Sequence, residues 1–105
     1  MKTVLIYVIT CWQDPYPKLT QASLETWDAV NVEGVETRFY CGLPKHPDQE
    51  KVLQLTVPEG LLNMGRKDLA AYRYALDNLS WDYMARVNVS CYVRKRKLLE
   101  RCTTR

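Results

Sequence analysis

Glycine is scarce in this 105-residue sequence, and its four glycines form neither a GxGxxG nor a GxxxxGK motif. Those motifs bring backbone N–H groups close to phosphates, so their absence disfavours P-loop NTPases and dinucleotide-binding dehydrogenases. The single histidine, His46, lies in a proline-flanked segment, where we expect a solvated side chain. No Ser/His/Asp motif accompanies it, so nothing in the sequence indicates a catalytic triad.

Metal-binding spacings and membrane signals are also lacking. The four cysteines are Cys11, Cys41, Cys91 and Cys102. None has CxxC or histidine-paired spacing, which argues against a zinc knuckle and favours a reduced setting. The longest apolar run, residues 4–9, is too short to cross a bilayer, and Lys2 alone does not make a signal peptide. We therefore expect a cytoplasmic protein with no membrane segment.

The composition, with 47% hydrophobic and 26% charged residues, is typical of a globular protein, and the length suits one domain over residues 1–105. The net charge is +3. Positive charge gathers near the C-terminus, in the run 94–97 and then at Arg101 and Arg105. Such a segment suggests an anionic partner, phosphate or nucleic acid, or else a solvated helix face.

Strand and helix patterns alternate along the chain. Residues 3–10 form a continuous apolar, β-branched run, as in a central parallel strand covered on both faces. Leu69, Tyr72, Leu76 and Leu79 recur at helical spacing behind Asn63, a candidate cap. The predicted strands cover residues 3–10, 37–41, 51–57 and 83–89, and the predicted helices cover residues 19–30, 63–78 and the basic segment after residue 93.

The order β-α-β-β-α-β-α predicts an α/β fold with a mostly parallel sheet of about four strands, flanked by helices. We expect the third strand near an edge and the fourth to be buried, ending in polar residues. Ligands of such sheets bind outside the carboxyl ends of the strands. Cys11, Gly42 and Ser90 should all lie on that rim.

Four segments, in order, carry a resemblance to a known family: QASLETW, VETRFYCG, NMGRKDLAAYRYAL and WDYMARVNVSCYV. Together they resemble the donor-binding half of nucleotide-sugar glycosyltransferases with the A-type fold, especially galactosyltransferase-like and viral or phage enzymes. The family's Asn-Leu-Thr-x-Lys type of turn is matched by residues 63–67, NMGRK. Its Lys-Thr-Asp-x-Asp-Val-Phe-Val strand, which reads Arg-Thr-Asn-x-Ser-Ser in other members, is matched by residues 86–93, RVNVSCYV.

The resemblance implies a Rossmann-like half that binds a nucleotide-diphosphate sugar, with a UDP-sugar as the expected donor. The reaction would transfer the sugar to a hydroxyl of a carbohydrate or other acceptor. Lys67, Arg66, Arg86 or the basic run 94–97 could stabilise the departing diphosphate. The implied donor-binding residues are Thr10, Cys11, Trp12, Arg66, Lys67, Arg86, Asn88 and Ser90.

In that family the last acidic residue of the Asp-x-Asp motif holds Mn²⁺ or Mg²⁺, and the first meets the ribose. Here both positions are neutral, Asn88 and Ser90. Divalent ions prefer anionic oxygen ligands, so these two candidate ligands predict a metal site that is weak or not needed.

Other interpretations stay open. Asn88 and Ser90 could cap the following helix, and Lys67 could be an exposed first-turn residue. No residue is a convincing catalytic base, so we expect either a minimal enzyme or the donor half of a longer one. A symmetric second copy could replace the missing half in a homodimer. A different class of function is a non-catalytic binding module whose basic last helix contacts nucleic acid or a protein partner.

Overall fold

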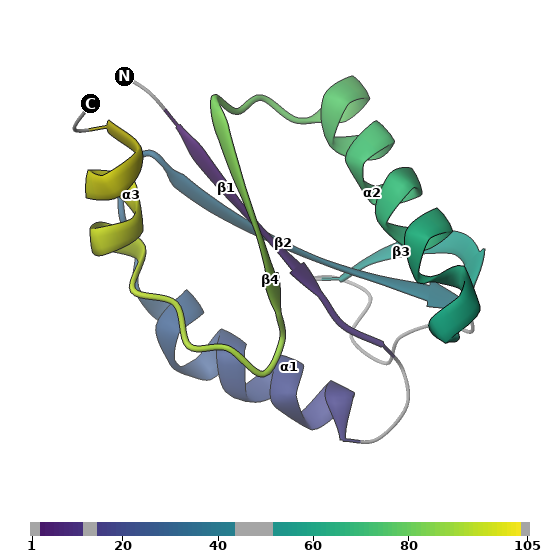
Figure 1. The fold of residues 1–105 in the computed structure, drawn as a ribbon. Coiled ribbons are helices and arrows are strands. Elements are labelled where there is room, and N and C mark those ends of the chain that lie inside the picture. The colour runs from purple at the N-terminus through teal and green to yellow at the C-terminus, as the bar shows by residue number, and fades with distance from the viewer. Residues whose placement is uncertain (1–2, 12–14, 44–51, 104–105) are drawn as a thin grey trace.

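The computed structural model describes residues 3–11, 15–43 and 52–103 (Figure 1). Strands and helices alternate as the sequence predicts, with two short 3₁₀ turns between them. The elements are β1 (Val4–Ile9), α1 (Tyr16–Glu25), η1 (Trp27–Ala29), β2 (Val35–Leu43), β3 (Val52–Pro58), η2 (Leu61–Asn63), α2 (Met64–Asn78), β4 (Tyr83–Asn88) and α3 (Lys95–Thr103).

The four strands form one sheet in the order β3-β2-β1-β4, and all three pairings are parallel. β1 is central, with Val4 paired to Val35 on one side and to Tyr83 on the other. The chain is therefore α/β with an all-parallel sheet, and its strand order is that of a Rossmann-like half. The predicted central strand and the predicted edge position of β3 are both confirmed.

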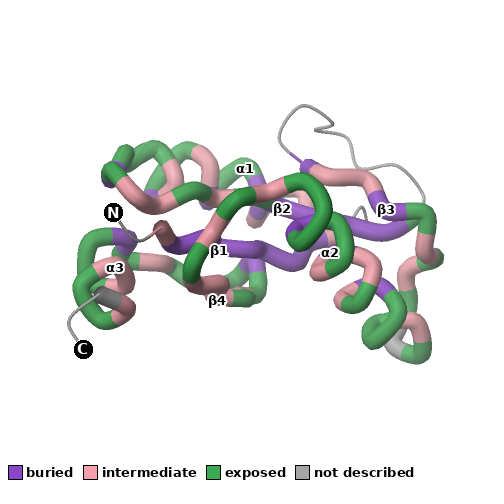
Figure 2. The backbone as a smooth tube through the Cα atoms, turned by 90° about the horizontal axis from the view of Figure 1, so that it is seen from above, coloured by how far each residue is buried: buried purple, intermediate pink, exposed green. Residues whose placement is uncertain are grey.

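Two apolar layers cover the faces of the sheet because successive side chains of β1 point in opposite directions. Leu5 and Tyr7 pack with Ala71 and Ala75 of α2, whereas Ile6 and Val8 pack with Trp27 and the α1 and α3 side. Figure 1 shows α2 on one side of the sheet and α1 with α3 on the other. Burial is most complete along β1, as the purple tube of Figure 2 shows.

The prediction of a buried fourth strand is wrong. β4 stands at the edge of the sheet, where β1 is its one neighbour. Its side chains are half-buried or exposed, and the strand ends at Asn88 instead of residue 89. The apolar side chains of β4 therefore contact only the layers above and below the sheet. The outer edge of β4 has no strand beside it among the described residues.

The apolar stripe predicted for α2 is also wrong in part. Leu69 and Leu76 are 61% and 72% exposed, whereas Tyr72 and Leu79 pack at the margin of the core as predicted. The fully buried residues of the helix are Lys67, Ala71 and Ala75. Small alanines suit this buried face because two large buried side chains, Tyr7 and Tyr40, fill the space beneath the helix. The Tyr7 hydroxyl donates to the Ala71 carbonyl over 2.8 Å, which fixes the helix above the strand.

The ends of the helices differ from the sequence prediction, and α1 stops at Glu25 instead of residue 30, before the separate turn η1. α1 begins at Tyr16, three residues early, because Pro17 occupies the first turn, where its missing N–H and fixed φ cost little. Asn63 does precede α2, but its side chain makes no capping hydrogen bond. Within the described ranges, no helix is both long enough and apolar enough to cross a membrane.

Replacing Gly42 by alanine should destabilise the protein by about 1–3 kcal/mol, because overpacking has this cost. A Cβ atom there would lie 2.4 Å from the carbonyl oxygen of Val57. Gly65→Ala is the matched control, since its Cβ would meet nothing within 4 Å and alanine favours a helix by about 0.5 kcal/mol. Urea unfolding followed by circular dichroism gives both values, and equal effects of the two changes would contradict the structure.

Stability should also fall at alkaline pH because of Tyr7. Burial, with a smaller effect from Tyr74, raises the pKa of Tyr7 from 10.0 to about 12. The folded state then keeps a proton that the unfolded state loses, so the protein loses about 2 kcal/mol as pH rises between these values. Urea unfolding across this range should show a smaller loss in Tyr7→Phe than in the control Tyr92→Phe, whose side chain is 70% exposed. Equal losses would contradict the assignment.

Candidate functional site

A cavity of about 400 Å³ opens at the carboxyl edge of the sheet, a volume within the range of small-molecule sites. Its walls come from the end of β1, the start of α1, the turn after β3, the start of α2 and the end of β4. We call it the edge cleft. Its lining residues are Ile9, Thr10, Cys11, Tyr16, Glu59, Gly60, Met64, Lys67, Arg86 and Asn88.

The position of the edge cleft follows from the strand order. The connection from β1 through α1 leads to β2 on one side, whereas β4 lies on the other side of β1. The connection from β1 through α1 and the connection through α2 to β4 therefore run in opposite directions from the sheet. A crevice remains between the carboxyl ends of β1 and β4. Ligands of open parallel sheets bind at such a switch point.

Lys67 lies inside the molecule, so the interpretation of an exposed first-turn residue is wrong. Its residue exposure is 4%. Its Nζ atom donates to the Thr10 carbonyl and to Glu59 Oε1, each over 2.7 Å. An ammonium group has three N–H donors, and these acceptors account for two of them among the described residues. Lys67 thus lines the edge cleft with two of its donors already used.

Glu59 is the site residue that the sequence reasoning missed. Its Oε2 accepts a 2.9 Å hydrogen bond from the backbone N–H of Gly42, while its Oε1 holds Lys67. Glu59 follows directly after β3, in the turn Pro58-Glu59-Gly60 on the predicted rim. An acidic residue at the end of a strand was therefore the signal in the sequence that could have identified it. Gly60 makes this turn possible with a φ of +128°, which other residues rarely adopt.

Arg86 is oriented by a chain of polar side chains that crosses the face of the sheet. Its guanidinium lies 3.1 Å from Asp68 Oδ2, and Asp68 Oδ1 accepts a 2.8 Å hydrogen bond from the hydroxyl of Tyr40. Burial, and then the hydrogen bond to Asp68, raise the pKa of Tyr40 well above its usual value, so Tyr40 stays a donor. Arg86 is thereby held with its side chain 36% exposed, at the wall of the edge cleft.

Asn88 and Ser90 form a local turn and not a helix cap. The Asn88 Oδ1 atom accepts from the Ser90 N–H over 3.1 Å and from the Ser90 hydroxyl over 3.2 Å. Because α3 begins at Lys95, the alternative that this pair caps the next helix is wrong. The oxygen offered to a metal is neutral and already accepts two hydrogen bonds, so the pair suits a divalent ion poorly. Elsewhere in the described part of the chain, no three acidic, histidine or cysteine residues gather as ligands.

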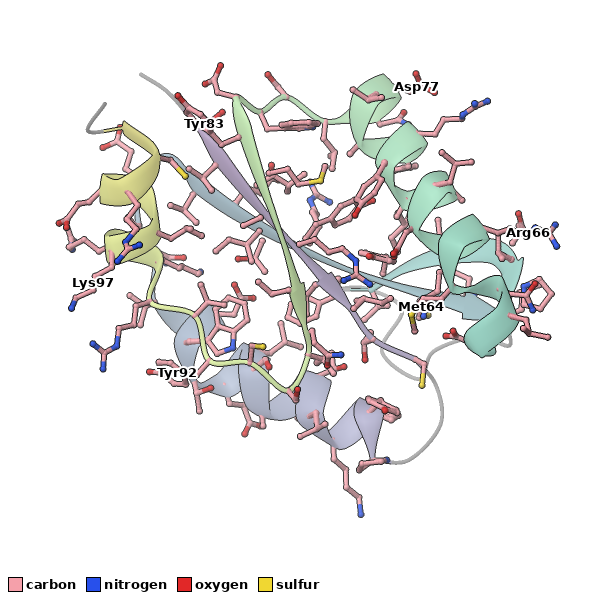
Figure 3. All side chains as sticks on the ribbon, viewed as in Figure 1. Met64, Arg66, Asp77, Tyr83, Tyr92 and Lys97 are labelled. Atoms are coloured by element: carbon pink, nitrogen blue, oxygen red, sulfur yellow. The ribbon has the colours of Figure 1, made fainter. Side chains whose placement is uncertain are left out.

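The structure brings five of the eight predicted donor-binding residues together in the edge cleft. These five are Thr10, Cys11, Lys67, Arg86 and Asn88. Ser90 does not line the cleft, Arg66 points away from the molecule on α2 (Figure 3), and Trp12 lies outside the described residues. The Thr10 hydroxyl is bonded to the Thr20 hydroxyl over 2.7 Å, its N–H donates to the Tyr40 carbonyl over 2.9 Å, and its carbonyl accepts from Lys67. The roles of these residues toward a donor stay predictions.

No family model, no curated protein and no solved structure matches the chain. The edge cleft and the sequence resemblance are therefore the two indications of a function.

The Lys67–Glu59 pair should be a main source of stability at this edge. Glu59→Gln removes the carboxylate partner of the Lys67 ammonium, whose side chain is only 5% exposed. We expect the free energy of unfolding to fall by about 2–3 kcal/mol. Glu36→Gln is the control, since it breaks the exposed Arg38–Glu36 pair and should cost less than about 0.5 kcal/mol. Urea unfolding measures both. Similar losses in the two variants would contradict the role given to the buried pair.

Proposed function

We propose that the edge cleft binds a nucleotide-diphosphate sugar, and that the chain is the donor-binding half of a glycosyltransferase that acts on a hydroxyl acceptor. The observation that carries this proposal is the convergence of Lys67, Arg86 and Asn88 at the switch point beside the end of β1. The sequence resemblance assigns the same three residues to the donor.

Hydrogen-bond donors dominate the polar groups of the edge cleft, which supports a phosphate-bearing ligand. Lys67 offers one N–H, Arg86 offers the guanidinium donors turned away from Asp68, and Asn88 offers its amide N–H₂ because its oxygen is bonded to Ser90. The first residues of two helices, Tyr16 of α1 and Met64 of α2, also lie at the cleft. Helix N-termini favour anions, so both add to the same preference.

The charges of the edge cleft are balanced before a ligand arrives. Lys67 faces Glu59, and Arg86 faces Asp68, so two cations meet two carboxylates. Attraction of a diphosphate would then come from oriented donors and not from excess positive charge. We expect binding that depends on the shape and hydrogen bonding of the donor, with a modest dependence on salt.

A catalytic base is not provided by Glu59, the one carboxylate that lines the edge cleft among the described residues. Both of its oxygens already accept short hydrogen bonds, from Lys67 and from Gly42. Proton removal from an acceptor hydroxyl needs a base within about 3 Å of that hydroxyl. We therefore propose that residues outside the cleft provide the acceptor site and the base, from a further segment or a second copy.

Isothermal titration calorimetry with UDP-glucose, UDP-galactose and UDP tests the proposal. Arg86→Gln should weaken binding about tenfold, because a charge-assisted hydrogen bond to phosphate is lost. Arg66→Gln is the matched control: it removes the same charge from a residue outside the cleft and should leave binding unchanged. Absence of heat with every nucleotide diphosphate would refute the proposal, and so would an equal effect of the two variants.

Binding of the donor should not require a metal ion. The affinity for UDP-sugar should differ less than twofold between solutions with Mn²⁺ and with EDTA. Asn88 offers a metal one neutral oxygen that already accepts two hydrogen bonds, and the Ser90 hydroxyl lies away from the cleft. Calorimetry under both conditions measures this directly. A donor affinity that rises tenfold or more with Mn²⁺ would show that ligands other than this pair complete a metal site.

A further inference from the structure

A second cavity, of about 270 Å³, lies beside the start of α3 and is separate from the edge cleft. We call it the α3 cavity. It is formed by the end of α1's connection to β2 and by the segment that leads into α3. Its lining residues are Trp27, Val30, Val32, Tyr92, Val93, Arg94, Lys95, Arg96 and Lys97.

Positive charge gathers on the wall of the α3 cavity. Lys95 is buried, with 6% exposure, and is held by Asp28 Oδ1 over 2.9 Å and by the Val30 carbonyl over 2.8 Å. This interaction fixes the start of α3 against the η1 turn. Arg94, Arg96 and Lys97 are exposed around it.

The start of α3 concentrates positive charge. The first turn of α3 contains no acidic residue, although the positive end of the helix dipole favours one there. Arg96 and Lys97 instead add their charges to that positive end, while Lys95 is paired with Asp28. An anion bound at this point would interact favourably with both the dipole and the side chains.

Aromatic and apolar groups share the cavity with the cations. The side chain of Tyr92 is 70% exposed, and Figure 3 shows Tyr92 and Lys97 projecting on the α3 side of the molecule. Trp27 also lines the cavity, is 2% exposed and has an indole N–H with no acceptor among the described residues. The Lys95 ammonium lies over the ring of Trp27, 5.9 Å from its centroid, so the cavity combines a cation with an aromatic face.

We infer that the α3 cavity and its basic rim form a binding site for single-stranded nucleic acid, a function beyond the proposed donor site. Arg94, Arg96 and Lys97 contact phosphates, and a base stacks on Tyr92, a combination typical of single-strand sites. Only residues 95–97 of the basic run belong to α3, and they cover about 4.5 Å of helix axis, so the contact involves few phosphates. An unpaired base is needed for stacking, which favours a single strand over a duplex.

Fluorescence anisotropy with a labelled oligouridylate of about 12 nucleotides tests the inference. Binding should weaken with salt, with a slope of log K against log salt of about −2 for three phosphate contacts. Arg96→Gln/Lys97→Gln should weaken binding at least tenfold, and Tyr92→Leu at least fivefold. Arg66→Gln/Arg73→Gln is the matched control, because it removes the same charge from exposed residues of α2. Circular dichroism shows whether each variant is folded.

The outcomes separate the single-stranded site from its competitors. The inference would be overturned if anisotropy did not change at low salt. It would also be overturned if the two double variants lost equal binding affinity, because net charge alone would then explain the binding. Equal binding of a duplex of the same length or of polyglutamate would also overturn it, in favour of a general anion surface. An unchanged affinity in Tyr92→Leu would remove the stacking contact on which the choice of a single strand depends.

Discussion

The ammonium group of Lys67 joins three segments that are far apart in the chain: the end of β1 through the Thr10 carbonyl, the turn after β3 through Glu59, and α2 itself. A buried charge is stable only when it is paired and hydrogen-bonded. Glu59 in turn is fixed by the Gly42 N–H at the end of β2. These hydrogen bonds hold the carboxyl ends of the strands and the start of α2 around the Lys67 ammonium. The segments held in this way form the walls of the edge cleft.

The order of the elements and the parallel sheet could be predicted because they depend on local patterns. The apolar run of β1 and the turn residues between the strands are readable without any knowledge of contacts. The inward face of α2 could be predicted only in part by apolar periodicity, which selected the exposed Leu69 and Leu76 together with Tyr72 and Leu79, which pack against the core. The actual face combines alanines with a lysine, and it is determined by the tyrosines of β1 and β2 beneath it.

The candidate site could be predicted in part for a similar reason. Residues at strand ends, such as Thr10, Cys11 and Asn88, must meet at one edge once the sheet is parallel. Glu59 was missed because its importance comes from a pair of contacts, with Lys67 and Gly42, that depends on where β3 lies beside β2. Ser90, which was predicted with the same group, does not line the edge cleft, and its N–H and hydroxyl bond to Asn88 in a local turn.

The two cavities differ in how their cations are balanced, and this difference has a chemical meaning. At the edge cleft each cation has a carboxylate partner, so a ligand must supply a specific geometry to compete for the remaining donors. At the α3 cavity Lys95 is paired with Asp28, but Arg94, Arg96 and Lys97 surround it at the positive end of a helix. Excess charge attracts anions over a distance of about one Debye length, whereas balanced pairs do not. The first arrangement suits selection among similar small molecules, and the second suits capture of a polyanion.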